Sequence, residues 1–109
     1  MLNYSKAPNN SGDAFQRFIE EGIPTGSFLE ALLSNDLAQA CARADYINQD
    51  LIFEYTHFMW NELPSSAWGS RENYKNWIAH VNKIKQEGNH EKFLKDLEET
   101  KSHISQGGI

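Results

Sequence analysis

Residues 46–60 read YINQDLIFEYTHFMW, and the apolar residues of this stretch do not all fall on one helical face. At about 100° per residue, most of them share one side of a helix. Tyr46, Phe53 and Trp60 recur at intervals of seven and fall on the opposite side. Such a helix either packs between other helices on both sides or exposes its second apolar stripe to a partner. The sequence leaves both interpretations open.

Working outward from this stretch, the pattern predicts one continuous helix from about residue 37 to about residue 62. Asp36 is a good residue for the helix N-cap, and Pro64 prevents continuation beyond the end. A helix of this length would extend for about 39 Å at 1.5 Å per residue. Its core-facing stripe is expected to comprise Leu37, Ala40, Cys41, Ala44, Ile47, Leu51, Ile52, Tyr55, Phe58 and Met59.

A polar edge runs between the two apolar stripes of this predicted helix. Aromatic side chains are enriched as anchors in protein interfaces, and charged neighbours orient a partner. If the second stripe is exposed, Tyr46, Phe53 and Trp60 are therefore the expected partner anchors. The polar edge that would accompany them contains Asp36, Arg43, Asp50, Glu54 and His57.

The rest of the chain predicts an all-α fold, a small bundle of four to five helices around the long one. No segment shows a sustained alternation of apolar and polar residues, so no sheet is expected. Residues 1–11 and 105–109 are polar and predict flexible tails. Residues 12–104 then form a single helical domain, which suits a chain of 109 residues.

Composition favours a cytoplasmic protein. Cys41 is the single cysteine, so no intrachain disulfide can form, and its place on the core stripe predicts a buried thiol. No apolar run approaches the roughly 20 residues that span a bilayer, and the N-terminus lacks a signal pattern. Residues 13–70 carry nine acidic and two basic side chains, in a chain of net charge −5. This balance argues against direct binding to nucleic acid and permits binding to a basic protein.

The sequence contains little evidence for an active site or a metal site. Glu54 and His57 have the Glu-x-x-His spacing of di-metal bundles, but a second copy of the motif is absent, so no metal is expected. No nucleophile, base and orienting group come together in a motif, so we expect neither an enzyme nor a cofactor. Trp68 lies in a loop between helices, where it either covers the end of the core or offers a stacking platform for a small ligand.

A set of turn and cap residues between about residues 22 and 80 follows the pattern Pro-x-Gly-Ser-Phe-Leu, Leu-x-Asn-Asp-Leu, Arg-Ala-Asp, Pro-x-x-x-Trp-Gly-Ser and Trp. The matching residues are Pro24, Gly26, Ser27, Phe28 and Leu29, then Leu33, Asn35, Asp36 and Leu37, then Arg43, Ala44 and Asp45, then Pro64, Trp68, Gly69 and Ser70, and finally Trp77. In these residues the chain resembles a group of short proteins encoded by bacteriophages and prophages. The resemblance implies a phage origin and a small accessory role.

These observations predict a non-enzymatic binding protein that acts by stoichiometric occlusion. The expected partner is a host protein, or a bacterial defence protein, with a basic surface. One alternative is a homo-oligomer built through the same aromatic stripe. The other is a sponge for a small nucleotide ligand, with a pocket near Trp68 and Arg43.

Overall fold

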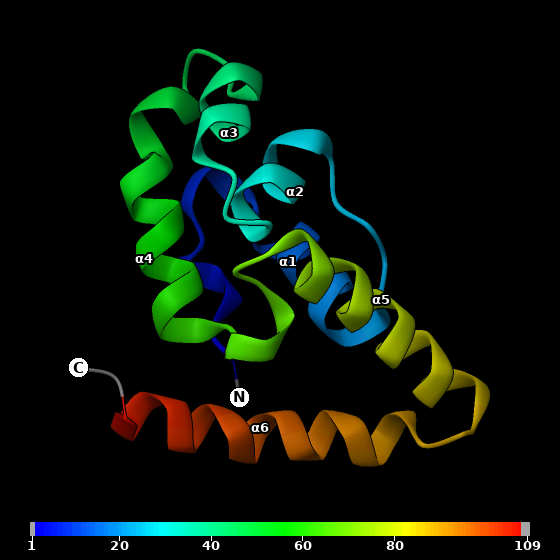
Figure 1. Ribbon diagram of the computed structural model, residues 1–109. Coiled ribbons are helices and arrows are strands. Elements are labelled where there is room, and N and C mark those ends of the chain that lie inside the picture. The colour runs from blue at the N-terminus through cyan, green and yellow to red at the C-terminus, as the bar shows by residue number, and fades with distance from the viewer. Residues whose placement is uncertain (1, 108–109) are drawn as a thin grey trace.

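The computed structural model describes residues 2–107, with side chains from residue 2 to residue 98 (Figure 1). Within that range it contains only helices, so the predicted all-α bundle is confirmed. The α-helices are α1 (Gly12–Glu21), α2 (Ser27–Leu33), α3 (Leu37–Arg43), α4 (Ile52–Glu62), α5 (Arg71–Gln86) and α6 (His90–Gly107). Four short 3-10 turns lie between or before them: η1 (Tyr4–Lys6), η2 (Pro8–Asn10), η3 (Asn48–Leu51) and η4 (Ser65–Ala67).

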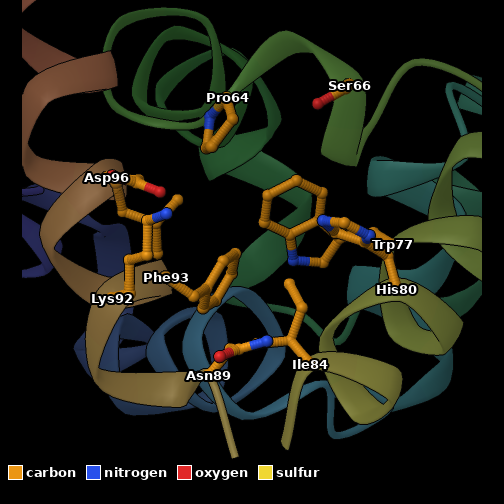
Figure 2. A pocket seen from close by; sticks show the side chains of 10 residues that line it. Pro64, Ser66, Trp77, His80, Ile84, Asn89, Lys92, Phe93 and Asp96 are labelled. Carbon is orange, nitrogen blue, oxygen red and sulfur yellow. The ribbon is translucent and has the colours of Figure 1, made fainter. Parts of the chain in front are cut away.

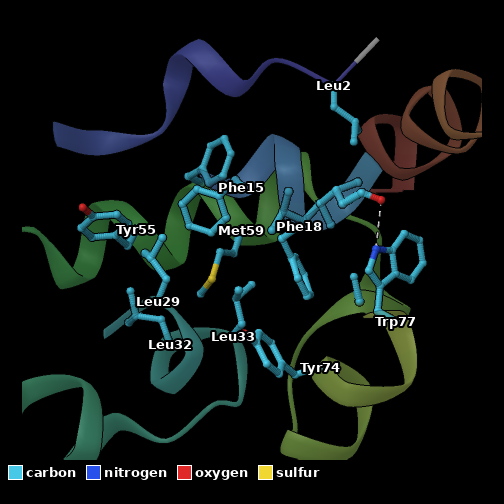
Figure 3. Close-up of a cluster of buried hydrophobic side chains, with 14 of the residues drawn as sticks. Leu2, Phe15, Phe18, Leu29, Leu32, Leu33, Tyr55, Met59, Tyr74 and Trp77 are labelled. Atoms are coloured by element: carbon cyan, nitrogen blue, oxygen red, sulfur yellow. Dashed lines mark hydrogen bonds between the residues drawn. The ribbon is translucent and has the colours of Figure 1, made fainter. Parts of the chain in front are cut away.

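The core is centred on α1, whose inward side chains contact α4 and α5 (Figure 3). Phe15, Phe18 and Ile19 are completely buried, as the amphipathic spacing of this helix requires. The ring of Phe15 lies 4.8 Å from that of Phe58 on α4, measured between centroids. The ring of Phe18 stacks on Tyr74 of α5 at 5.0 Å. These aromatic contacts join the three helices into one bundle.

The predicted long helix from residue 37 to residue 62 is wrong. α3 ends at Arg43, and α4 begins only at Ile52 (Figure 1). Between them the backbone turns, so that α3 and α4 run in opposite directions on either side of the loop at the top of the view. Ala44 is extended, and the Asp45 carboxylate accepts a hydrogen bond from the Asn48 N–H at 2.7 Å. Aspartate side chains compete with helical hydrogen bonds in this way, which favours a turn.

Contacts from distant parts of the chain also hold this break in place. The side-chain oxygen of Asn48 accepts hydrogen bonds from the Tyr55 hydroxyl at 2.8 Å and from the Asn9 amide at 3.1 Å. A continuous helix would move Asn48 away from both donors. The helical spacing of apolar residues contains no information about these partners.

Because of this break, only some residues of the predicted core-facing stripe are buried. Ala40, Tyr55, Phe58 and Met59 are buried as predicted. Three other members of the predicted stripe are exposed instead, because they lie on the outer side of α3 or in the turn: Leu37, Cys41 and Ile47. The prediction of a buried Cys41 thiol is therefore wrong.

The predicted flexible tail at residues 1–11 is also wrong, because most of it packs on the bundle. Leu2 is buried in the core at 5% exposure. The Asn3 N–H donates to the buried carboxylate of Glu62 at 3.2 Å, and the Lys6 ammonium lies 3.6 Å from the same carboxylate. At the other end, α6 includes residues 105–107 of the second predicted tail, and residues 108–109 lie outside the described residues.

Candidate protein-binding face

The structure places the three predicted aromatic anchors at the surface. Phe53 and Trp60 lie on the outer side of α4 and are 76% and 53% exposed. Tyr46 is 87% exposed but belongs to the turn before η3, so it does not continue the stripe along one helix. Within the part of the chain that the structure describes, these rings are exposed and none belongs to the core, so the interpretation of the second stripe as a core contact is wrong.

Two further apolar residues extend this surface next to Trp60. The rings of Trp60 and Trp68 meet nearly at right angles with their centroids 6.5 Å apart. A small cavity of about 50 Å³ lies beside Trp68 and is lined in part by Leu37 and Thr56. Thr56 is three residues after Phe53 and four before Trp60, so it shares their face of α4. We call Leu37, Phe53, Trp60 and Trp68 the aromatic face.

Leu37 is the member of the aromatic face that sequence reasoning missed. Helical spacing predicts it in the core, because a continuous helix would place it in register with Ala40 and Cys41. In the structure it is the first residue of α3 and is 64% exposed. Asp36 caps this helix by accepting a hydrogen bond from the Gln39 N–H at 3.1 Å. The cap fixes where α3 begins, and so places Leu37 at the cavity.

The loop that carries Trp68 is held by backbone contacts. The Trp68 carbonyl accepts a hydrogen bond from the Asn73 side-chain amide at 3.0 Å, and the following Gly69 N–H donates to the Leu33 carbonyl at 2.8 Å. Gly69 has φ of +103°, a backbone conformation that favours glycine. Trp68 is half-buried, and its ring contacts Trp60 and lines the small cavity.

The cavity at Trp68 does not suit the predicted nucleotide site. Pockets for small ligands typically have volumes of about 300–1,000 Å³, several times larger than this one. Arg43, the expected neighbour, does not line the cavity, because it lies at the far end of α3 and donates to Gln39 at 3.1 Å. The pairing of Trp68 with Arg43 in one ligand site is therefore a wrong prediction.

The predicted polar edge is dispersed, and part of it borders the aromatic face. Asp50 and Glu54 are exposed, and neither forms an ion pair with another described residue. His57 is exposed and stacks on Phe53, with ring centroids 6.1 Å apart, so it extends the aromatic surface. Asp36 lies 3.9 Å from Arg71, whose guanidinium also pairs with Glu30 at 2.9 Å.

The segment that carries Phe53, Trp60 and Trp68 is negatively charged, and Arg71, which follows it, pairs with Asp36 and Glu30. Residues 44–70 contain Asp45, Asp50, Glu54 and Glu62 and no lysine or arginine. Glu62 is buried and pairs with Lys6, so the other three carboxylates dominate the surface of this segment. A negative surface attracts a basic partner and repels phosphate groups.

Among the described residues, no three side chains of the metal-binding types lie close enough together to hold an ion. Burial raises the pKa of Tyr55, and its hydroxyl donates a hydrogen bond to Asn48. In the part of the chain with assigned structure, no helix has the length and apolar character needed to cross a bilayer.

Comparison of the chain with protein-family models, with curated proteins and with solved structures finds no match. Four residues of the turn-and-cap pattern come together in space. Asn35, Asp36, Leu37 and Trp68 line the same small cavity at the edge of the aromatic face. Three of them are neighbours in the chain, but Trp68 reaches the cavity from a distant loop.

Proposed function

We propose that the protein is a non-enzymatic binding protein that occupies a partner stoichiometrically through its aromatic face. The observation that carries this proposal is the exposure of Phe53 and Trp60, two turns apart on the same outer side of α4. Large aromatic side chains exposed together are costly in water, and they are the residues that most often anchor protein interfaces. Leu37 and His57 enlarge the apolar contact on either side.

The acidic border indicates the kind of partner. Asp50 and Glu54 would meet lysine or arginine side chains, while the aromatic rings enter an apolar groove on the same partner surface. Charges at the border of an interface chiefly accelerate association and select the partner. A basic protein with an exposed apolar groove therefore fits the aromatic face best.

A second copy of this chain fits the face less well. In a two-fold dimer the same surface meets itself, so the carboxylates of Asp50 and Glu54 would approach their own counterparts or lie near them. Juxtaposed like charges disfavour association. The homo-oligomer is accordingly our second candidate, and the mass of the protein in solution tests it directly.

The resemblance to phage-encoded proteins supports a specific biological role. A phage accessory protein that binds without catalysis would act as an inhibitor or modulator of a bacterial protein, such as a component of anti-phage defence. That role places it in the host cytoplasm. The small size and acidic surface are consistent with such an inhibitor, since occlusion requires only one well-placed face.

The test is affinity capture from bacterial lysate by the tagged protein and by the double variant Phe53→Ser/Trp60→Ser. A matched control, Lys75→Ser/Asn76→Ser, changes two exposed residues on α5, away from the aromatic face. We expect one bacterial protein to be captured by the natural chain and the control and lost from the double variant. The purified pair should then form a complex of defined stoichiometry by light scattering. Capture that is equal for all three forms would contradict the proposal.

A further inference from the structure

The connection between α3 and α4 joins two halves of the chain that share the hydrophobic core. Residues 2–43 contain η1, η2 and the helices α1 to α3, and residues 52–107 contain α4 to α6 with η4. The ring of Phe15 in the first half packs on Phe58 in the second, with centroids 4.8 Å apart. A large part of the core therefore lies between the halves, while one short connection, residues 44–51, carries the chain from one half to the other.

Hydrogen bonds also join the two halves at specific points. The Trp77 indole N–H donates to the Ile19 carbonyl at 3.1 Å (Figure 3). The Gly69 N–H donates to the Leu33 carbonyl at 2.8 Å. The ring of Phe93 on α6 lies 5.9 Å from Trp77 (Figure 2), which keeps α6 with the second half. Because all these contacts join complementary surfaces, the second half of another copy would supply the same partners to the first half.

The backbone of the connection departs little from a helix. It contains no glycine or proline, and none of its residues has a positive φ. Ala44 is extended, with φ of −69° and ψ of 135°. Ile47 is already in the right-handed helical region, and residues 48–51 form a 3-10 turn. Rotation of a few backbone angles near Ala44 and Asp45, through conformations that are sterically allowed, would join α3 and α4 into one helix.

Apolar residues continue in helical register across this connection. Read as one helix, the segment places Leu37, Cys41 and Ile47 on the same side as Tyr55. In the single chain these three residues are exposed, whereas Tyr55 is buried. Straightening the connection would return them to the side of Tyr55. In a two-fold pair of chains the straightened segments meet near their midpoints, so each covers part of this apolar side of the other.

We propose that the α3–α4 connection opens as a hinge and that two copies of this chain exchange residues 2–43. Each first half then packs on the second half of the other copy, and one continuous helix replaces α3 and α4. The pair keeps the core contacts of the single chain, so exchange is a low-cost route to a dimer. It loses the Asn48 contacts with Tyr55 and Asn9 and gains helical hydrogen bonds across residues 44–51. The aromatic face takes no part, so this inference is independent of the proposed function.

The experiment concentrates the full chain, opens it partially in urea and returns it to buffer. Size-exclusion chromatography with light scattering then separates a dimer from the monomer. Mixing ¹³C-labelled with unlabelled chains distinguishes exchange from association through a surface. Isotope-filtered NOE spectra of the dimer should show contacts between Phe15 of one chain and Phe58 of the other. Circular dichroism should show more helix in the dimer than in the monomer.

Two variants and one control test the hinge. Ile47→Pro should weaken the dimer about a hundredfold, because proline disrupts the interior of a continuous helix. The single chain tolerates this change, since φ of Ile47 is −76° and its side chain is exposed. Asp45→Ala/Asn48→Ala removes the side-chain contacts of the turn and should favour the dimer about tenfold. Gln49→Ala, at an exposed position of the same turn, should change the equilibrium little.

The outcomes separate exchange from association through the aromatic face. A dimer without the Phe15–Phe58 contact between chains overturns the proposal, and so does a dimer that Ile47→Pro leaves undiminished. Failure of both the natural chain and the double alanine variant to dimerise overturns it as well. The variant Phe53→Ser/Trp60→Ser should dimerise like the natural chain. Loss of the dimer in that variant would contradict exchange and assign the dimer to the aromatic face.

Discussion

The rings of Trp60 and Trp68 pack at right angles, with an interplanar angle of 81° and a centroid separation of 6.5 Å. This contact joins the exposed side of α4 to the loop that follows η4. Trp60 is thus held at one edge while 53% of its surface stays exposed. An anchor that is partly positioned before binding loses less side-chain entropy when a partner covers it. In our proposal, the Trp60–Trp68 contact therefore makes this end of α4 the centre of binding energy.

Phe53→Ser should leave the protein almost as stable as the natural chain, because its ring is exposed. Substitutions of this kind usually change the free energy of unfolding by no more than about 0.5 kcal/mol. Phe58→Ala on the buried side of the same helix should cost about 3–5 kcal/mol. Urea unfolding of both variants measures the difference. A large loss of stability in Phe53→Ser would mean that this ring belongs to the core.

Association with the bacterial partner should slow as salt is added. The exposed carboxylates of Asp50 and Glu54 attract a basic surface, and salt screens this attraction over a distance of about 10 Å at 0.1 M. Asp50→Asn/Glu54→Gln should lower the association rate at low salt and change the dissociation rate little. Surface plasmon resonance at several salt concentrations measures both rates. An association rate that does not depend on salt would refute a basic partner surface.

Asp45→Ala should destabilise the turn between α3 and α4. The substitution removes the acceptor for the Asn48 N–H and should lower the free energy of unfolding by about 1 kcal/mol. Helix content by circular dichroism should not rise, because Asn48 remains bonded to Tyr55 and Asn9. A stable variant with increased helix content would show that a continuous helix competes closely with the observed turn.

Leu2→Ala should destabilise the bundle by about 2 kcal/mol, the lower part of the range for a buried leucine. A residue in a flexible tail would have no such effect. Thermal or urea unfolding distinguishes a packed N-terminal segment from a flexible tail. Ser5→Ala, at an exposed position in the same segment, serves as the control. Equal stability of both variants would show that the N-terminal segment does not pack as described.

Cys41 should react with a thiol reagent in the folded protein at nearly the rate seen in denaturant, because it is exposed on α3. A buried thiol reacts only when the protein opens, and its labelling is slowed accordingly. Timed labelling with a chromogenic disulfide, with and without urea, measures both rates. Strong protection in the absence of urea would restore the original prediction that Cys41 belongs to the core.

Several features of this protein follow from the sequence alone because their causes are local. The spacing of Phe15, Phe18 and Ile19 identifies the buried side of α1 whatever it packs against. Gly22 ends this helix in the left-handed conformation, with φ of +68°, as its position before Pro24 indicates. The lack of alternating patterns excluded strands from the prediction. The sequence also identified Phe53 and Trp60 as lying opposite the core side of their helix.

Other features depend on contacts between residues that are far apart in the chain, and only the tertiary structure shows them. Helical periodicity shows which side chains share a face, but it does not show whether another helix covers that face. The exposure of Phe53 and Trp60 depends on how the other described helices are arranged around α4. The turn at Asp45 depends on Asn48 meeting Tyr55 and Asn9, and the burial of Leu2 depends on where the other helices leave space for it. Such contacts join residues far apart in the chain, so no local pattern contains them.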